Sequence, residues 1–273
     1  MWYRFFKKIK VTTKIQGGLG NQLFQIAAAL NYAKTHNFKP LFTNAKQLNN
    51  RYTYWDIFNT KGDLCLESIN EKKFVKTGHN IFPTQKSEKN LMLIGYYQSE
   101  KFVNPVKNEM ENLLFSNDKV NDLVAAEYDK IVARFHTEDL VFIHLRRGDY
   151  LKFADVHTNL EMDYYKKALS TLSESMPVVV FSNDQDWCKE NLKKHINNPL
   201  YYVSEIDYVE LLLMSKIKNA IIANSSFSWW GAYLNQHKDK KVLAPKQWFA
   251  KAWKEKNPNK SWNAIYCKGW EKL

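Results

Sequence analysis

The chain has 273 residues, of which 45% are apolar and 15% aromatic, so it can bury a sizeable core in one large domain or two smaller ones. This composition excludes a disordered chain, and no apolar run is long enough to cross a membrane. The formal net charge of +12 favours an anionic partner, such as nucleic acid, a phosphorylated substrate or an anionic membrane surface. A lysine-rich composition without functional meaning is an equal alternative.

The first part of the chain has the pattern of a β-α-β unit. A strand is expected over Val11–Gln16, and the Gly17–Gly20 turn ends it. Apolar residues at helical spacing then predict a helix from Asn21 to about His36, and Pro40–Thr43 reads as a second strand. A glycine turn before a helix N-terminus suits a bound anion or polar group, but a tight turn that only packs helix on strand has the same pattern.

Residues 46–90 show few clear elements. Leu91–Tyr97 is a further strand candidate, and helices are expected over Phe102–Phe115 and Lys119–Phe135, with a kink at Pro105. The charged residues 136–139 have the composition of a linker.

From Leu140 onward, strands and helices alternate, which predicts a second parallel α/β unit. The strands are expected at 140–145, 178–182, 200–203, 220–223 and 242–244, and the helices at 162–173, near 187, at 208–217 and from about 228. We therefore expect two α/β domains, 1–138 and 139–273, with a cleft between them.

The segment His144–Tyr150 places two arginines and a carboxylate directly after a buried strand. Guanidinium groups match phosphate oxygens in a bidentate way, and ligands of open α/β sheets collect at the carboxyl ends of strands. A pyrophosphate site and a surface ion-pair cluster are equally good interpretations of this segment alone.

Two other strand ends carry polar residues. Asp184 and Asp186 follow the strand at 178–182 with a spacing that suits Mg²⁺ or Mn²⁺, but a two-residue spacing is weak evidence for a metal site. The competing interpretation is that Asp184 accepts hydrogen bonds from a base or ribose while Asp186 caps the next helix. Asn224–Ser228 leads from a buried strand into a helix, where free N–H groups and hydroxyls can hold phosphate oxygens. The tryptophans that follow, Trp229 and Trp230, are expected in the core.

The sequence gives little support for a dinucleotide-binding site, a metal site or a disulfide framework. Gly18-x-Gly20 matches only part of a dinucleotide fingerprint, because Leu23 stands at the third glycine position. The isolated histidines show no metal spacing. The three widely spaced cysteines show neither a zinc pattern nor a disulfide framework, so a reducing cytoplasm is expected.

Four segments together resemble the family 11 glycosyltransferases, the inverting α-1,2-fucosyltransferases. They are Gly17–Gln25, Gly95–Lys101, His144–Tyr150 and Asn224–Ala232, in this order. The resemblance implies a GT-B-like fold of two Rossmann-like domains that face a central cleft. It also implies GDP-fucose as donor substrate, with no cofactor and no obligatory metal.

The resemblance further implies roles for individual residues. Arg146 would grip the β-phosphate, with His144 and Arg147 shaping the site and Asp184 near the guanosine. The implied catalytic residues are Arg146, Asp149 and Asn21. The implied donor-binding residues are His144, Arg146, Arg147, Asp184, Asn224, Ser225, Ser226 and Phe227. The implied wall of the glycine turn is formed by Gly18, Gly20, Asn21 and Gln22. Asp149 could assist the acceptor or orient an arginine, and the sequence does not choose between these roles.

The implied acceptor is a galactose-terminated surface glycan, in a bacterial, cytoplasmic form of the enzyme. The basic, aromatic N-terminus is also compatible with a peripheral contact with the anionic inner face of the membrane. No nucleic-acid partner is expected. Two alternatives remain: a metal-dependent transferase that uses another nucleotide sugar through Asp184 and Asp186, and a non-catalytic protein that binds glycans or nucleic acid.

Overall fold

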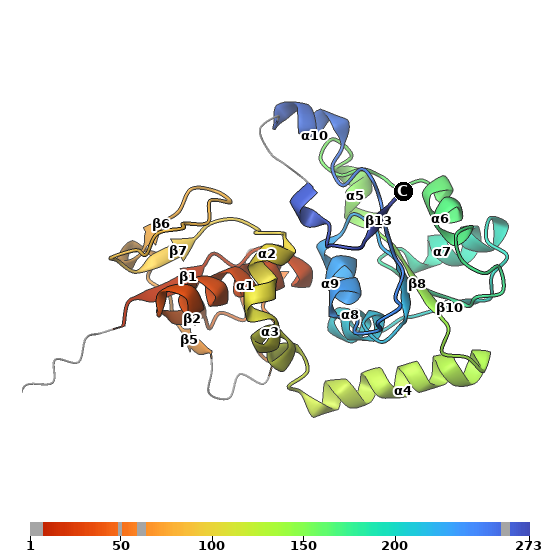
Figure 1. The fold of residues 1–273 in the computed structure, drawn as a ribbon, viewed down its shortest axis with the longest axis horizontal. Coiled ribbons are helices and arrows are strands. Elements are labelled where there is room, and N and C mark those ends of the chain that lie inside the picture. The colour runs from red at the N-terminus through yellow and green to blue at the C-terminus, as the bar shows by residue number, and fades with distance from the viewer. Residues whose placement is uncertain (1–7, 49–50, 59–63, 258–262) are drawn as a thin grey trace, which may run out of the picture. The chain divides into compact units, whose positions relative to one another are not determined.

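The computed structural model describes residues 8–48, 51–58, 64–257 and 263–273, apart from the side chains of Arg51 and Asp149. The chain divides into two compact units, Met1–Asn117 and Asp118–Leu273 (Figure 1). Helix α4 (Asp118–Phe135) belongs to the second unit because it packs against helix α8 (Asp207–Met214).

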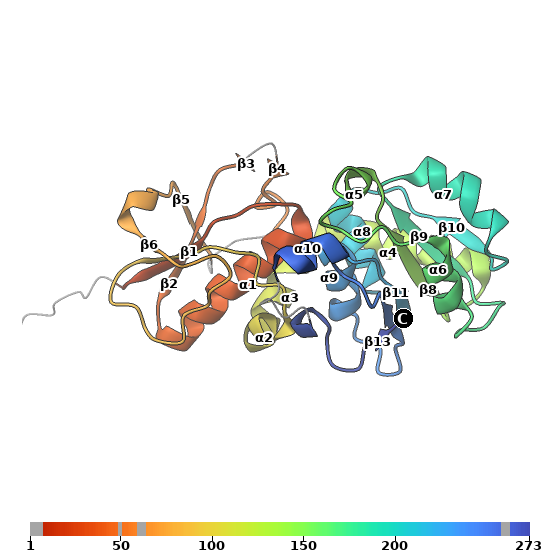
Figure 2. The ribbon, with the colours of Figure 1, turned by 90° about the horizontal axis from the view of Figure 1, so that it is seen from above.

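The N-terminal unit is built on a five-stranded parallel sheet of order β5-β2-β1-β7-β6. Its strands are β1 (Lys10–Thr13), β2 (Lys39–Thr43), β5 (Cys65–Glu67), β6 (Val75–Lys76) and β7 (Leu91–Leu93). Helix α1 (Leu19–His36) runs along one face of this sheet (Figure 2). A separate antiparallel pair joins β3 (Gln47–Leu48) to β4 (Arg51–Tyr52), and the short 3₁₀ helix η1 (Glu71–Lys73) precedes β6.

Two features of this unit follow from local chemistry. Helix α1 ends where Asn37 adopts a left-handed conformation (φ 56°), which asparagine tolerates well. The helix expected over 102–115 is interrupted rather than kinked, because Pro105 lies in a 3₁₀ turn, η2 (Asn104–Val106). This turn separates α2 (Glu100–Val103) from α3 (Lys107–Leu114).

The C-terminal unit contains a six-stranded parallel sheet of order β10-β9-β8-β11-β12-β13. Its strands are β8 (Val141–Leu145), β9 (Val178–Ser182), β10 (Leu200–Tyr202), β11 (Asn219–Ile221), β12 (Val242–Ala244) and β13 (Glu271–Lys272). Helices α6 (Met162–Leu169) and α7 (Gln185–Asn191) cover one face, and α8 and α9 (Ser226–Leu234) cover the other (Figure 1).

The core of this unit confirms the strand pattern expected from the sequence. Val141, Ile143 and Leu145 point toward α6 and α7, where they join one buried cluster. Trp229 and Trp230 are fully buried, as expected. The sequence did not predict β13, α5 (Gly148–Lys152) or α10 (Lys251–Lys256), which are too short to show a hydrophobic period.

Within the described ranges, no helix combines the length and the apolar character that a membrane crossing requires.

Glu210, which is half-buried on α8, leads us to expect that the stability of this unit depends on pH. Burial, with a smaller contribution from the charges of Asp207 and Glu205, raises the pKa of Glu210 to about 7, while the hydrogen bond from the Glu205 N–H to Glu210 Oε1 (3.3 Å) acts in the opposite direction. Because the folded-state pKa lies above the ordinary 4.5, this group's stabilising contribution is complete below pH 4.5 and is lost as the pH rises through 7.

We expect Glu210→Gln to gain about 2 kcal/mol of unfolding free energy relative to the wild type between pH 5 and pH 8, because glutamine never ionises. Urea unfolding at both pH values measures this. Glu190→Gln, which changes an exposed carboxylate on α7, is the matched control and should show no such trend. A Glu210→Gln difference that stays constant with pH would contradict the assigned pKa.

Candidate functional site

Three neighbouring strands of the C-terminal sheet, β9, β8 and β11, end in the polar residues singled out from the sequence. His144 is the next-to-last residue of β8, with Arg146 and Arg147 directly after the strand; Asp184 follows β9, and Asn224 follows β11. All three strands run parallel, so their carboxyl ends meet at one edge of the sheet. The structure thus brings the arginine segment, Asp184 and the Asn224–Phe227 segment together.

Arg147 is held from three directions. Its Nε donates to Asp184 Oδ2 (3.3 Å), and its guanidinium lies over the Trp187 ring, 3.6 Å from the centroid. Its backbone N–H donates to Asn183 Oδ1 (3.0 Å). A Cβ on Gly148 would clash with Asn183 Nδ2, so glycine lets the Asn183 side chain approach this closely. Arg147 therefore has a fixed position between a carboxylate and an aromatic ring.

Arg146 has a different support. Its half-buried guanidinium lies over the Tyr150 ring, 5.4 Å from the centroid. The Tyr150 ring is stacked on His157, with 3.9 Å between centroids, and its hydroxyl donates to Asn224 O (3.0 Å). Tyr150 thus couples the arginine after β8 to the loop after β11.

The N-terminus of α9 offers groups that can bind an anion. Ser225 is the N-cap, and its Oγ accepts the Phe227 N–H (3.3 Å). No hydrogen bond of Ser226 Oγ is found among the described residues, and this side chain is half-buried. The Asn224 amide is used internally instead, because its Nδ2 donates to Thr158 O (2.9 Å) and Trp248 O (2.8 Å).

His144 is buried with only 3% of its surface exposed, and its ring lies 5.5 Å from the Phe227 ring. Burial, together with the charge of Arg146, lowers the pKa of His144 to about 3, so this imidazole is neutral at pH 7. A neutral imidazole has one donor and one acceptor nitrogen, and it can contribute either to a ligand.

Several buried polar atoms at this edge of the sheet have no hydrogen-bond partner among the described residues. They are His144 Nδ1, Thr158 Oγ1, Asn159 Oδ1 and Gln185 Oε1. Buried polar groups in proteins are nearly always hydrogen-bonded, so such a cluster marks a place where a ligand or ordered water supplies the partner.

The glycine turn of the N-terminal unit forms a second set of contacts, at the carboxyl end of β1. Gly17 has a φ of +80°, and a Cβ there would lie 2.7 Å from Asn21 Nδ2, so this position requires glycine. Gly18 is the extended N-cap of α1, and Gly20 is buried in its first turn.

Asn21 and Gln22 have defined partners. Asn21 Oδ1 accepts a hydrogen bond from Gln98 Nε2 (2.7 Å), which joins the Gly17–Gln25 and Gly95–Lys101 segments. Gln22 Nε2 donates to Gly17 O (2.9 Å) and Tyr52 O (2.7 Å), so this side chain holds the turn in place.

The remaining candidates are less defined. Asp149 lies in α5, but its side chain is outside the described part of the structure. Asp186 is exposed in the first turn of α7, while Asp184 is paired with Arg147.

Sequence reasoning missed three residues of this site: Asn183, Trp187 and His157. Trp187 follows Asp184 by one helical turn, which was an available signal; the contact of His157 with Tyr150 arises only in the fold.

Comparisons with known sequences find related transferases. Residues 87–273 match Glycosyl transferase family 11. The O-antigen biosynthesis glycosyltransferase WbnK of Escherichia coli is 32% identical, with 91% of this chain and 98% of WbnK covered. An alpha-1,2-colitosyltransferase of Escherichia coli is 27% identical (88% and 92% covered), and a galactoside 2-alpha-L-fucosyltransferase of Caenorhabditis elegans is 23% identical (86% and 71% covered).

Solved structures show the same fold at low sequence identity. A mutant of Arabidopsis thaliana FUT1 in complex with GDP has a TM-score of 0.54 and 13% identity, with 88% of this chain and 71% of that chain covered. NodZ alpha-1,6-fucosyltransferase, co-crystallized with GDP, has a TM-score of 0.52 and 11% identity, with 83% and 92% covered. The fold is therefore the GT-B-like α/β fold expected from the sequence.

Two neighbours in the Asn224–Phe227 segment should respond differently to alanine substitution. Asn224→Ala removes a donor from two backbone carbonyls, so we expect a loss of about 2–3 kcal/mol in unfolding free energy. Ser226→Ala removes a hydroxyl that bonds no described residue, so its loss should stay below about 0.5 kcal/mol. Chemical unfolding of both variants measures the difference, and equal losses would contradict the structural role of Asn224.

Proposed function

Because the chain belongs to glycosyltransferase family 11, we propose that it transfers L-fucose from GDP-fucose to a terminal galactose of a glycan, with inversion and an α-1,2 linkage. The chain is assigned to this family, and so to the glycosyltransferases, by the family match over residues 87–273 and by its 32% sequence identity to WbnK. The relative named a galactoside 2-alpha-L-fucosyltransferase supports the choice of sugar and linkage, and the GDP complexes of fold neighbours support the nucleotide.

The observation that carries this proposal is the hydrogen bond from the Tyr150 hydroxyl to Asn224 O (3.0 Å). It links the loop that carries Arg146 to the loop that begins α9. A guanidinium and the N-terminus of a helix are both suited to phosphate oxygens, and here they belong to neighbouring strand ends of one parallel sheet. A diphosphate that bridges them would be bound by fixed positive charge and by backbone N–H groups.

The arginines suit the chemistry of sugar transfer from a nucleoside diphosphate. The bond between the anomeric carbon and the β-phosphate oxygen breaks, and its electron pair remains on that oxygen. The acceptor hydroxyl oxygen forms the new bond from the opposite face, through an oxocarbenium-like transition state, and loses its proton to a base or to solvent. Arg146 would stabilise the negative charge that grows on the leaving phosphate.

We also propose that this reaction needs no metal ion. Asp184 is engaged with Arg147, and this pairing supports a role in orienting a cation of the protein rather than in holding a free one. The Trp187 ring supports the same guanidinium from its face. Two arginines would then supply the electrophilic function that Mg²⁺ or Mn²⁺ supplies in other transferases.

The N-terminal unit would contact fucose and acceptor through the glycine turn. Asn21 can only donate or accept hydrogen bonds, so it would orient a hydroxyl without removing its proton. Asp149 is the carboxylate of the arginine segment, and it is our candidate either for assisting the acceptor or for orienting an arginine.

Colitose is a second candidate for the transferred sugar. It is L-fucose without the 3-hydroxyl, and a relative that covers 88% of this chain is named an alpha-1,2-colitosyltransferase. A donor that differs by one hydroxyl needs the same diphosphate contacts, so the proposed roles of Arg146 and Arg147 apply to both sugars.

Substitution of Arg146 tests the leaving-group role. We expect Arg146→Ala to lower kcat by about 10²–10³-fold, because it removes charge that acts on the leaving phosphate. Arg146→Lys should restore only part of this loss, because an ammonium does not reproduce the guanidinium fork. Single-turnover rates with saturating donor measure the chemical step. Arg134→Ala, which removes an exposed arginine on α4, is the matched control and should leave the rate unchanged.

A donor and metal screen tests the proposed reaction itself. We expect turnover of GDP-fucose, or of GDP-colitose, with lactose, N-acetyllactosamine or lacto-N-biose, and an α-1,2-linked product by NMR. The rate should be the same with and without EDTA. Full loss of activity in EDTA that Mn²⁺ restores would contradict the metal-free mechanism, and turnover of only UDP-sugars would contradict the choice of nucleotide.

A further inference from the structure

The positive charge of the chain is concentrated in the N-terminal unit. Residues 1–117 contain 17 basic and 8 acidic residues, a net charge of +9. Residues 118–273 contain 23 basic and 20 acidic residues, a net charge of +3. The two arginines of the proposed donor site lie in the less charged unit, so donor binding leaves the lysine excess of the other unit unexplained.

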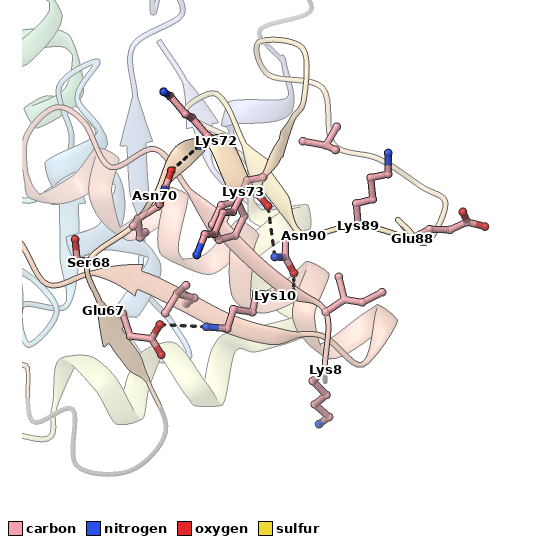
Figure 3. A pocket seen from close by; sticks show the side chains of 15 residues that line it. Lys8, Lys10, Glu67, Ser68, Asn70, Lys72, Lys73, Glu88, Lys89 and Asn90 are labelled. Carbon is pink, nitrogen blue, oxygen red and sulfur yellow. Dashed lines mark hydrogen bonds and ion pairs between the residues drawn. The ribbon is translucent and has the colours of Figure 1, made fainter. Parts of the chain in front are cut away.

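A cavity of about 690 Å³ gathers part of this excess (Figure 3). It lies at the amino ends of three neighbouring parallel strands. Lys8–Lys10 leads into β1, Lys72–Val75 into β6 and Glu88–Asn90 into β7. Glu67–Asn70, from the last residue of β5 onward, and Leu41 of β2 complete the lining. A volume of this size accommodates a small ligand or a lipid headgroup.

The charges in this cavity are unbalanced. Five lysines line it, and one of them, Lys10, pairs with Glu67 (3.1 Å). Within the described residues, no ion pair is found for the other four, which are Lys8, Lys72, Lys73 and Lys89. The second acid, Glu88, points away from the Lys10–Glu67 pair in Figure 3.

The backbone that carries these lysines is fixed. Asn90 Oδ1 accepts the Lys10 N–H (2.9 Å), and Asn90 Nδ2 donates to Lys73 O (3.4 Å). Asn70 caps η1 by accepting the Lys72 N–H (3.1 Å). The ammonium groups therefore extend from an ordered framework, and a bound anion need not organise the loops.

This cavity is separate from the glycine turn proposed to face fucose and acceptor. The turn follows the carboxyl end of β1, whereas Lys8–Lys10 precedes its amino end. The cavity also mixes charge with apolar surface: Ile9 and Phe74 line it, and Val75 is 48% exposed. Apolar and cationic side chains together suit an amphiphilic anion better than a free nucleotide.

We propose that this cavity binds the phosphate group of an anionic lipid and so docks the N-terminal unit on a membrane surface. The sequence before Lys8, Trp2-Tyr3-Arg4-Phe5-Phe6-Lys7, has the aromatic and basic composition of membrane-interface segments, which favours a lipid over a soluble phosphate. The site takes phosphodiesters or phosphomonoesters at a lipid–water interface. This docking does not depend on which sugar is transferred.

Vesicle binding of the full chain tests the proposal. We expect the protein to co-sediment with vesicles of 30% phosphatidylglycerol in phosphatidylcholine at 0.1 M salt, and not with pure phosphatidylcholine. Lys72→Gln, Lys73→Gln and Lys89→Gln combined should lower the partition constant at least about tenfold, since each lysine near an anionic surface contributes about a factor of five. Transfer to a soluble acceptor should be unchanged in this variant.

A matched triple variant controls for net charge. Lys167→Gln, Lys194→Gln and Lys238→Gln together remove three exposed lysines of the C-terminal unit and should lower the partition constant less than twofold. Thermal unfolding of both triple variants verifies that they are folded.

Three results would overturn the proposal. Equal losses in the two triple variants would show that bulk charge, not this cavity, binds the vesicles. Equal binding to neutral and anionic vesicles would exclude phosphate recognition. The third result combines two measurements. If inorganic phosphate or glycerol phosphate raises the thermal unfolding temperature of the wild type but not of the cavity variant, and the wild type does not bind vesicles, the cavity binds a soluble anion.

Discussion

The C-terminal unit depends on keeping two adjacent guanidinium groups apart at the end of one buried strand. Arg146 and Arg147 carry like charges and are half-buried, so water screens their repulsion less than it would on an open surface. Each therefore has its own aromatic support: Tyr150 under Arg146 and Trp187 under Arg147. Arg147 is in addition paired with the Asp184 carboxylate, so its position is fixed between a ring and an acid. The two rings thus hold both cations at the carboxyl end of β8, where the proposed mechanism uses Arg146 on the leaving phosphate.

The parallel sheet fixes where these groups lie, and hydrogen bonds between loops fix how they point. Strands β9, β8 and β11 deliver their carboxyl ends side by side. The loops after them are then joined by Tyr150 to Asn224 O, and by Asn224 to the backbone at Thr158 and Trp248. Gln185 joins the end of β9 to Val203 O beyond β10 (2.6 Å). These hydrogen bonds join uncharged side chains to backbone carbonyls, so they use none of the charged groups of the site. They also leave the Ser226 hydroxyl and the His144 ring for a ligand. A preorganised edge of this kind is what a transition state with growing negative charge requires.

The sequence predicted the parts of this fold whose signal is local. Strand β9 is the run Val178–Ser182, and α4 follows its apolar spacing nearly to the residue, because long regular segments carry their own period. The sequence could not predict in the same way which residues of each motif make internal hydrogen bonds and which are left for a ligand. Asn224 looks like a ligand-binding amide in the sequence, yet its donors go to two carbonyls from distant loops. Asn21 is paired with Gln98, 77 positions away, and such a pairing exists only once the sheet has formed. Residue types indicate what chemistry is available, but which group is already satisfied is decided by tertiary contacts.

The same distinction separates the two kinds of positive charge in this chain. Arg146 and Arg147 lie at carboxyl strand ends, half-buried and supported by rings, where a few well-placed donors act on a small ligand. Of the five lysines at the amino ends of β1, β6 and β7, four are exposed and have no acidic partner among the described residues. An ammonium is a strongly hydrated point charge without a fixed fork, so a group of lysines binds anionic surfaces through their field rather than through exact geometry. Under the two proposals, one chain would carry a rigid arginine site that acts on the donor and a separate lysine cavity that docks the N-terminal unit on an anionic surface.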